Sequence, residues 1–196
     1  MKNIDLYYDF RSPYTYFAYH RLSILTDKGA TVSWKPVSTN VLINLQAGRD
    51  PQADIVDPLC PPKRAHFMSD IFRLIKHWEV PFALPEPPRP VCDLAMIVAT
   101  RLTADNIEHG KFRKAVFETV WRRQQDANNP DILKACLVKA GLPQELVETA
   151  QTDGEASLMR NTIAAYDAGI FGVPTFVLDD EVFFGADRME LLATYL

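Results

Sequence analysis

The sequence predicts an α/β fold in which a βαβ unit and a ββα unit are separated by a large all-helical insertion. Two observations support this prediction. Both ends of the chain contain short runs rich in β-branched and aromatic residues, whereas apolar residues in the middle recur at helical spacing. We therefore assign residues 1–62 and 169–196 to one domain and residues 63–168 to a helical insertion domain.

The N-terminal unit consists of two predicted strands joined by a helix. The run Ile4–Phe10 is aromatic and β-prone, and Thr31–Ser38 has a similar character. Between them, Ser12-Pro13 is a typical helix start, because serine caps the first turn and proline needs no N–H there. We expect this helix to continue to about Thr26. Together the three elements fit a parallel βαβ unit.

The middle of the chain is predicted to be mostly helical. A proline-rich run from Pro81 to Pro90 is expected to form an extended loop within it. Asn129-Pro130 and Leu142-Pro143 are helix start signals, and Gly141 is a stop signal. The predicted helices cover approximately residues 63–78, 92–102, 111–125, 131–139, 144–149 and 155–168.

The C-terminal unit is a predicted hairpin followed by a helix. Thr175–Leu178 and Glu181–Phe184 are expected to be strands on either side of the short connection Asp179-Asp180. Asp187, with Glu190 three residues later, fits a capping box at the start of the final helix. The outer parts of the chain thus have the order βαβ–ββα, which is that of the thioredoxin fold.

Charge and composition exclude several classes of function. The net charge is −4 and no basic stripe is present, so we expect neither nucleic acid nor a membrane as a partner. The sequence shows no secretory signal pattern, and no apolar run approaches the ~18 residues of a membrane span. The three cysteines, Cys60, Cys92 and Cys136, are widely spaced, which argues against a disulfide framework or a metal cluster. This cysteine usage predicts a cytoplasmic location.

The start of the first helix carries the main functional signal. Thioredoxin-like proteins have the pattern Cys-x-x-Cys here, whereas this chain has Ser12-Pro13-Tyr14-Thr15. A dithiol–disulfide cycle needs two thiols, so we predict that the chain is not a disulfide oxidoreductase. The free N–H groups of a helix start favour a thiolate, and a serine hydroxyl can donate a hydrogen bond to it. The site therefore suits an external thiol such as glutathione, although capping alone also explains Ser12.

A second functional position precedes the hairpin. We expect the Val173-Pro174 bond to be cis, because thioredoxin-like folds have a cis proline at this point. Most X–Pro bonds are trans, so the prediction depends on the position in the fold and not on the dipeptide. The backbone of Val173 would then let glutathione, a short peptide, pair like an added strand.

Three motifs in this order and spacing resemble one superfamily. The sequence resembles the DsbA-like thioredoxin proteins and, within them, the 2-hydroxychromene-2-carboxylate isomerases and the kappa-class glutathione transferases. The resemblance extends over nearly the whole chain and implies a glutathione site, a small aromatic keto acid or electrophile as substrate, and a homodimer. The motifs are Tyr8-Asp9-Phe10-Arg11-Ser12-Pro13-Tyr14, Phe171-Gly172-Val173-Pro174-Thr175 and Phe184-Gly185-Ala186-Asp187-Arg188.

The resemblance also implies roles for individual residues. Ser12 would hydrogen-bond the glutathione sulfur, and Val173, beside Pro174, would pair with the cysteinyl backbone. Asp187 would hold the γ-glutamyl ammonium group. An N-cap at the final helix explains Asp187 equally well, and the two roles are compatible.

Other implied contacts are less direct. Lys63 or Arg64, with Arg64 preferred, would meet a glutathione carboxylate, although both also fit solvated charges at a helix start. Arg49 stands in a loop where the family often has asparagine, and Ala186 stands where kappa-class transferases tend to have serine. The alanine would remove one hydrogen bond to glutathione, which contributes about 0.5–1.5 kcal/mol.

We predict from this resemblance a glutathione-dependent isomerase of the 2-hydroxychromene-2-carboxylate isomerase type. A glutathione thiolate held by Ser12 would add reversibly to an unsaturated aromatic keto acid. Arg11, Arg49 or Tyr14 would orient the substrate. The alternatives are a kappa-class-like transferase that conjugates small electrophiles, and a non-catalytic thiol-peptide binding protein of the same fold.

Overall fold

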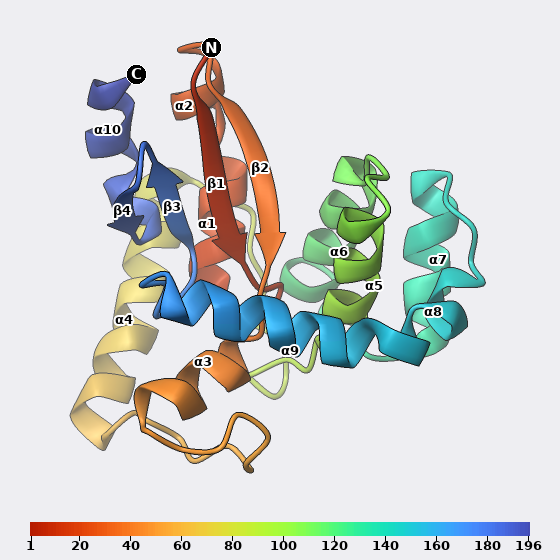
Figure 1. Ribbon diagram of the computed structural model, residues 1–196. Coiled ribbons are helices and arrows are strands. Elements are labelled where there is room, and N and C mark those ends of the chain that lie inside the picture. Colours follow the sequence, from red (N-terminus) through yellow and green to blue (C-terminus); the bar gives the residue numbers. More distant parts are fainter.

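A four-stranded mixed sheet of strand order β2-β1-β3-β4 organises the protein, and the computed structural model describes residues 1–196 (Figure 1). β1 (Asn3–Tyr8) pairs in parallel with β2 (Thr31–Pro36) and antiparallel with β3 (Thr175–Leu178). β3 forms a hairpin with β4 (Glu181–Phe184). The thioredoxin-like α/β fold is therefore confirmed, and both hairpin strands have the predicted bounds.

The central strand buries alternate residues. Ile4, Leu6 and Tyr8 are fully buried, as the two-residue period of a strand requires when one face meets the core. Leu6 lies opposite Trp34 of β2 and Phe176 of β3. The Tyr8 and Trp34 rings meet edge to face with their centroids 5.0 Å apart. This face of the sheet is therefore covered by a largely aromatic layer.

The helix predicted after β1 is interrupted near its middle. α1 (Pro13–His20) ends at Arg21, and a short α2 (Ser23–Thr26) follows. The Arg21 guanidinium lies 3.8 Å from the centroid of the Trp78 ring and donates a hydrogen bond of 2.7 Å to the carbonyl oxygen of Ala186. The break thus coincides with a side chain that joins α1 to two distant segments.

The predicted capping box at the C-terminal helix is wrong. Asp187 lies inside a 3-10 turn, η1 (Ala186–Arg188), and α10 (Met189–Leu192) follows without a side-chain cap. A second 3-10 turn, η2 (193–195), ends the chain. The Glu190 carboxylate forms an ion pair with Arg21 instead. A guanidinium is a stronger partner for a carboxylate than the backbone N–H that a capping box offers.

Seven helices lie between β2 and β3, one more than predicted. The additional helix is α3 (Thr39–Gln46), which Ser38 caps by accepting a hydrogen bond of 3.4 Å from the Val41 N–H. It falls within the part of the chain predicted to belong to the sheet domain. The others are α4 (Pro61–Trp78), α5 (Asp93–Ala104), α6 (Gly110–Trp121), α7 (Pro130–Ala140), α8 (Leu146–Thr149) and α9 (Gln151–Asp167).

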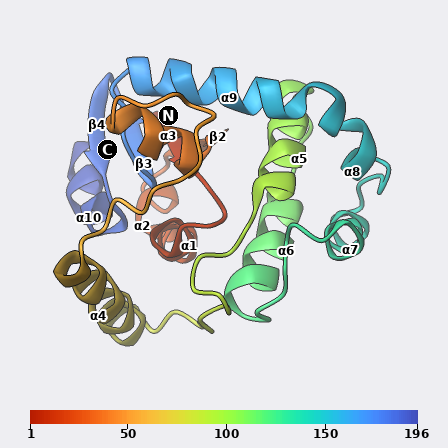
Figure 2. The same ribbon diagram turned by 90° about the horizontal axis from the view of Figure 1, so that it is seen from below.

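Helix α9 crosses the molecule below the carboxyl ends of β1 and β2, against α3 and α5 (Figures 1 and 2). Gly154 makes the approach to α5 possible. A Cβ atom at this position would lie 2.5 Å from Cγ2 of Ile97, which is far inside van der Waals contact. Only glycine therefore fits where the two helices cross.

One hydrophobic core of 40 buried residues joins the sheet to the helices. It includes Phe10 and Phe176 from the predicted sheet domain, and Phe112 and Trp121 from the predicted insertion. The indole Nε1 of Trp121 also donates a hydrogen bond of 2.8 Å to the carbonyl oxygen of Phe10. The predicted sheet domain and the predicted helical insertion thus share one core and are joined by a buried hydrogen bond.

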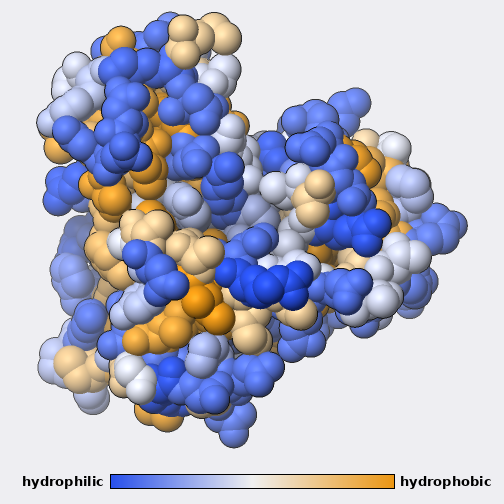
Figure 3. Space-filling model, viewed as in Figure 1, coloured by the Kyte–Doolittle hydropathy of each residue, from blue (hydrophilic) through white to orange (hydrophobic).

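Helix α4 and the hairpin carry some of the apolar residues that this core does not cover. On α4, Ile71 is buried, whereas the adjacent Phe72 is 54% exposed. On the hairpin, Val182 and Phe184 are also exposed, and Figure 3 shows hydrophobic surface gathered on the hairpin side of the molecule. No helix has the length and apolar composition needed to cross a membrane.

Candidate functional site

Ser12 caps α1 and contacts the loop before β3. Its hydroxyl accepts a hydrogen bond of 3.2 Å from the Thr15 N–H and donates one of 3.4 Å to the carbonyl oxygen of Val173. Ser12 is 8% exposed, and Pro13 occupies the first helical position as predicted. The structure therefore brings the two predicted contacts of a glutathione cysteine together at the positive end of a helix dipole.

The loop before β3 presents a free backbone donor. The Val173-Pro174 bond is cis, as predicted. The carbonyl oxygens of both neighbours are engaged, because Thr175 Oγ1 donates to Gly172 at 2.7 Å and the Gly185 N–H donates to Pro174 at 2.9 Å. The Val173 N–H makes no hydrogen bond within the chain. An extended peptide could pair with this group, as the sequence predicts.

Residues 9–12, which we call the site turn, are held from several sides. The buried Asp9 carboxylate accepts hydrogen bonds from the N–H groups of Arg11 (3.0 Å) and Thr39 (2.8 Å). The Phe10 N–H points at the sulfur of Met96 (3.4 Å), and the Phe10 carbonyl accepts from Trp121. The direction of Ser12 is therefore fixed by the start of α3 and by helices α5 and α6 of the predicted insertion.

Arg11 is bound by two carboxylates within the chain. Its guanidinium lies 3.0 Å from Asp9 and 2.5 Å from Asp93, and its side chain is 13% exposed. Burial alone lowers the pKa of Arg11, but these two carboxylates outweigh burial and hold that pKa above its ordinary value. Arg11 therefore stays positively charged, and its charge is paired with two carboxylates of the same chain. Its role in orienting a substrate stays a prediction.

Tyr14 is also engaged. Its hydroxyl donates a hydrogen bond of 3.2 Å to Asp70 of α4, and its ring meets Phe67 edge to face with centroids 5.9 Å apart. Burial, followed by the charge of Asp70, raises the pKa of Tyr14, so the hydroxyl stays protonated at neutral pH. Tyr14 thus connects the start of α1 to α4 through a hydrogen bond and an aromatic contact.

Asp187 lies next to α1 with its carboxylate open to solvent. Its side chain is 57% exposed and lies 3.6 Å from Arg188. The carboxylate folds back over Gly185, where an added Cβ would lie 2.5 Å from its Oδ1. Gly185 also has φ +107, a conformation that side chains disfavour. The adjacent Ala186 is buried, and its carbonyl oxygen accepts a hydrogen bond from Arg21. The expected loss of one hydrogen bond to glutathione at Ala186 stays a prediction.

The predicted basic residues lie around the start of α4 and the loop before it. Arg64 forms an ion pair with Asp57, which Arg89 also approaches at 3.4 Å. The guanidinium of Arg49 donates to the carbonyl oxygen of Asp54. Lys63 lies in the first turn of α4 and is exposed. None of these residues contacts Ser12 or Val173, so their roles toward glutathione stay predictions.

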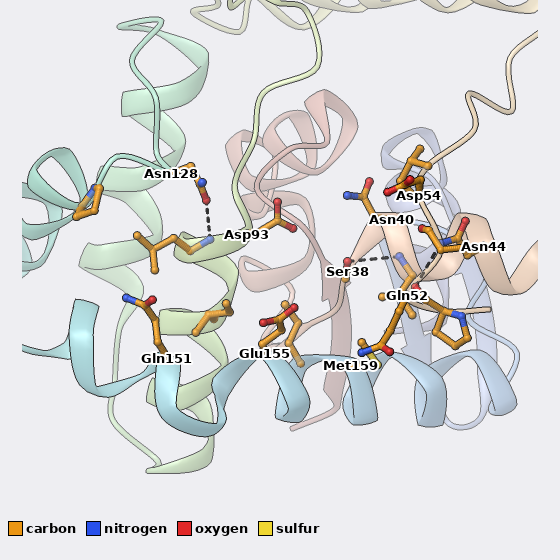
Figure 4. A pocket seen from close by; sticks show the side chains of 18 residues that line it. Ser38, Asn40, Asn44, Gln52, Asp54, Asp93, Asn128, Gln151, Glu155 and Met159 are labelled. Atoms are coloured by element: carbon orange, nitrogen blue, oxygen red, sulfur yellow. Dashed lines mark hydrogen bonds between the residues drawn. The ribbon is translucent and has the colours of Figure 1, made fainter. Parts of the chain in front are cut away.

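A cavity of about 650 Å³ lies beside the site turn, between α3, α5 and α9 (Figure 4). Neither Ser12 nor Val173 lines it, but Asp93 does, and Asp93 binds Arg11. Figure 4 shows Asp93, from the start of α5, and Glu155, from α9, both at the cavity. None of the 18 lining residues is Lys, Arg or His. The cavity therefore offers negative charge and hydrogen-bonding groups, and no cation.

The comparison with known families agrees with this geometry. The profile of the DSBA-like thioredoxin domain matches residues 3–196. The chain belongs to this family. Among DsbA-like relatives, 2-hydroxychromene-2-carboxylate isomerase of Sphingobium xenophagum is 27% identical, over 100% of this chain and 98% of the relative. Human glutathione S-transferase kappa 1 is 28% identical, over 100% of this chain and 91% of the relative.

A solved structure gives the same fold. The chain superposes on a selenomethionine 2-hydroxychromene-2-carboxylate isomerase with a TM-score of 0.78, 22% identity, and coverage of 98% of this chain and 93% of that one. The superposition supports the DsbA-like arrangement of the sheet and its helices.

The sequence interpretation missed Met96, Asp93 and Trp121, which hold the site turn. Of these, only Asp93 has a local signal, because it stands in the first turn of a predicted helix.

Proposed function

We propose that this DsbA-like protein is a glutathione-dependent isomerase of the 2-hydroxychromene-2-carboxylate isomerase type. The observation that carries the proposal is the contact between Ser12 and Val173 at the start of α1, in a chain without a thiol at the thioredoxin cysteine positions. Relatives named as such an isomerase and as a glutathione transferase match the chain over nearly its whole length. The cofactor in this proposal is glutathione.

The residues present fit glutathione. The Val173 N–H is a free backbone donor, and Val173 also carries a carbonyl oxygen bound only by Ser12, so a cysteinyl residue could pair with both groups. The Ser12 hydroxyl and the first turn of α1 would stabilise negative charge on a sulfur atom. The exposed carboxylate of Asp187 would meet an ammonium group at the other end of the tripeptide.

The chain's residues would act mainly by positioning. Bound glutathione would supply a thiolate for reversible addition to an unsaturated aromatic keto acid, followed by elimination of the same thiolate. Ser12 would donate a hydrogen bond to the sulfur, which would lower the pKa of the thiol and hold the thiolate at the start of α1. Asp9, Met96 and Trp121 would hold the site turn so that Ser12 does not reorient between the two steps.

A kappa-class-like glutathione transferase is the second candidate, and one observation favours it. A keto acid needs a cation for its carboxylate, yet Arg11 is bound by Asp9 and Asp93, and Arg49 is bound by a backbone carbonyl. A neutral electrophile would need no such cation. The two candidates share the glutathione site and differ only in the acceptor.

Glutathione titration calorimetry, combined with the ultraviolet absorbance of the thiolate, tests the proposal. The control for Ser12→Ala is Ser38→Ala, because both serines cap a helix through the same type of hydrogen bond. We expect the parent and Ser38→Ala to bind glutathione with a thiolate signal that Ser12→Ala suppresses. No binding by the parent at millimolar glutathione would overturn the proposal.

Turnover distinguishes the remaining alternatives. Interconversion of the cyclic and open forms of an aromatic keto acid would support the isomerase. Conjugation of a neutral electrophile, with glutathione consumed, would support the transferase. Glutathione binding without either reaction would indicate a non-catalytic thiol-peptide binding protein.

A further inference from the structure

The cavity beside the site turn has the size of a ligand site and the charge of a cation site. Its volume of about 650 Å³ lies within the range of small-molecule pockets. Asp93 is paired with Arg11, whereas Asp54 and Glu155 line the same cavity and make no ion pair. These carboxylates extend from three different elements: the start of α5, the loop after α3, and α9.

Two amide groups add hydrogen-bond acceptors to the cavity. Asn44 is 1% exposed and donates through Nδ2 to the carbonyl oxygens of Pro51 (3.3 Å) and Ala53 (2.7 Å). Its buried Oδ1 has no partner within the chain. Gln151 likewise uses its Nε2, in a 2.7 Å bond to the carbonyl oxygen of Val147. Both amides therefore have their nitrogen occupied and their oxygen left for a ligand that donates.

The acceptors are distributed along an apolar wall. No three His, Cys, Asp or Glu side chains in the protein gather closely enough to hold a metal ion. The carboxylates therefore suit separate charges on one elongated molecule better than a single ion. Hydrocarbon between these charges would lie against the apolar residues of α3, α5 and α9, which are Val41, Leu94, Ile97 and Leu158.

We propose that this cavity binds an aliphatic polyamine, with its ammonium groups at Asp54 and Glu155 and its methylene segments on the apolar wall. The Asn44 and Gln151 oxygens accept hydrogen bonds from its N–H groups. This site is separate from the proposed glutathione contacts at Ser12 and Val173, and it does not rest on the proposed function. It borders the site turn through the Asp93–Arg11 pair.

Titration of the protein with spermidine, without glutathione and at low salt, tests the proposal. The double variant Asp54→Asn, Glu155→Gln should bind at least about tenfold more weakly than the parent, because it removes both unpaired charges of the cavity. The matched control is Asp167→Asn, which removes one carboxylate from the same helix α9, outside the cavity. This control should bind as the parent does.

A second variant and a second ligand separate a built site from general charge attraction. Gln151→Lys places an ammonium group at the cavity and should abolish spermidine binding while circular dichroism stays that of the parent. An uncharged diol of similar length should not bind. The proposal is overturned if the parent does not bind millimolar spermidine, if the double variant or Gln151→Lys binds as the parent does, or if the diol binds equally well. Equal weakening by Asp167→Asn would also overturn it.

Discussion

The hydroxyl of Ser12 lies 3.4 Å from the carbonyl oxygen of Val173, although 161 positions separate the two residues in the sequence. This is long for an O–H···O hydrogen bond, whose usual length is about 2.7–2.8 Å. A hydroxyl has only one proton, so Ser12 can donate to Val173 or to a bound sulfur, but not fully to both. The long contact indicates that the Ser12 hydroxyl can turn its hydrogen bond from Val173 to a ligand.

Replacement of Ser12 should therefore impair catalysis far more than folding. We expect Ser12→Ala to lower kcat/KM by about 100–1,000-fold, the usual effect of losing one preorganised donor. Loss of the cap should lower the free energy of unfolding by about 1 kcal/mol. Ser12→Thr keeps a hydroxyl and should retain most of the rate. Steady-state kinetics and urea unfolding measure both effects, and equal rates for Ser12→Ala and Ser38→Ala would contradict this expectation.

Removal of the Asp187 charge should weaken glutathione binding without changing stability. Asp187 caps no helix and is largely exposed, so Asp187→Asn should leave the thermal midpoint unchanged. Its Kd for glutathione should rise about tenfold or more, because a hydrogen bond to a charged group contributes about 1.5–3 kcal/mol. Calorimetry measures the Kd, with Asp180→Asn in the exposed hairpin turn as the control. A lower thermal midpoint with unchanged affinity would indicate a structural role only.

His109 should make stability depend on pH. It is 7% exposed, and burial lowers its pKa below the ordinary 6.5. The unfolded chain therefore takes up a proton at a higher pH than the folded chain does. The corresponding stability is fully present above about pH 6.5 and is lost as the pH falls below this value toward the folded pKa. Burial also lowers the pKa of His20, which acts in the same direction.

Urea unfolding on both sides of pH 6.5 measures this effect. The free energy of unfolding of the parent should decrease more steeply with falling pH than that of His109→Asn. His66→Asn, at an exposed position on α4, should follow the parent. Parallel curves for the parent and His109→Asn would rule out this origin of the pH dependence.

The crossing of α5 and α9 should not tolerate a methyl group at Gly154. We expect Gly154→Ala to lower the free energy of unfolding by about 1–3 kcal/mol, because its Cβ would overlap Cγ2 of Ile97. Ile97→Ala should itself cost about 2–5 kcal/mol, but it removes the overlapping atom. The double variant should therefore be less destabilised than the sum of the two single variants, as a double-mutant cycle by urea unfolding can measure. Strict additivity would refute the overlap.

Local signals were sufficient to predict much of the fold. The bounds of β3 and β4 follow from two β-prone runs on either side of Asp179-Asp180, and both aspartates have the positive φ of a tight turn. Ser12-Pro13 likewise determines where α1 begins. The cap of α3 was equally local, since Ser38 precedes apolar residues at helical spacing, but the sequence interpretation did not use it.

The remaining features depend on partners distant in sequence. Glu190 was assigned to a capping box, but its partner is Arg21, 169 positions away. The ion pair of Arg11 with Asp93, 82 positions away, likewise has no signal near Arg11 in the sequence, and the expected role of Arg11 toward a substrate stays a prediction. A side chain has several acceptable partners in a sequence, and only the packed fold selects among them. The cavity could not be predicted for the same reason, because its walls come from separate helices.

The two backbone groups of Phe10 are both bound by side chains of the helical part, its N–H by Met96 and its carbonyl by Trp121. Helices α5 and α6 thus hold the backbone of the site turn in place. If either helix opens, the residue before Arg11 and Ser12 loses an anchor, so the site can persist only as long as these helices stay closed. A ligand that binds the ordered site turn should consequently slow amide hydrogen exchange in α5 and α6, which it does not touch.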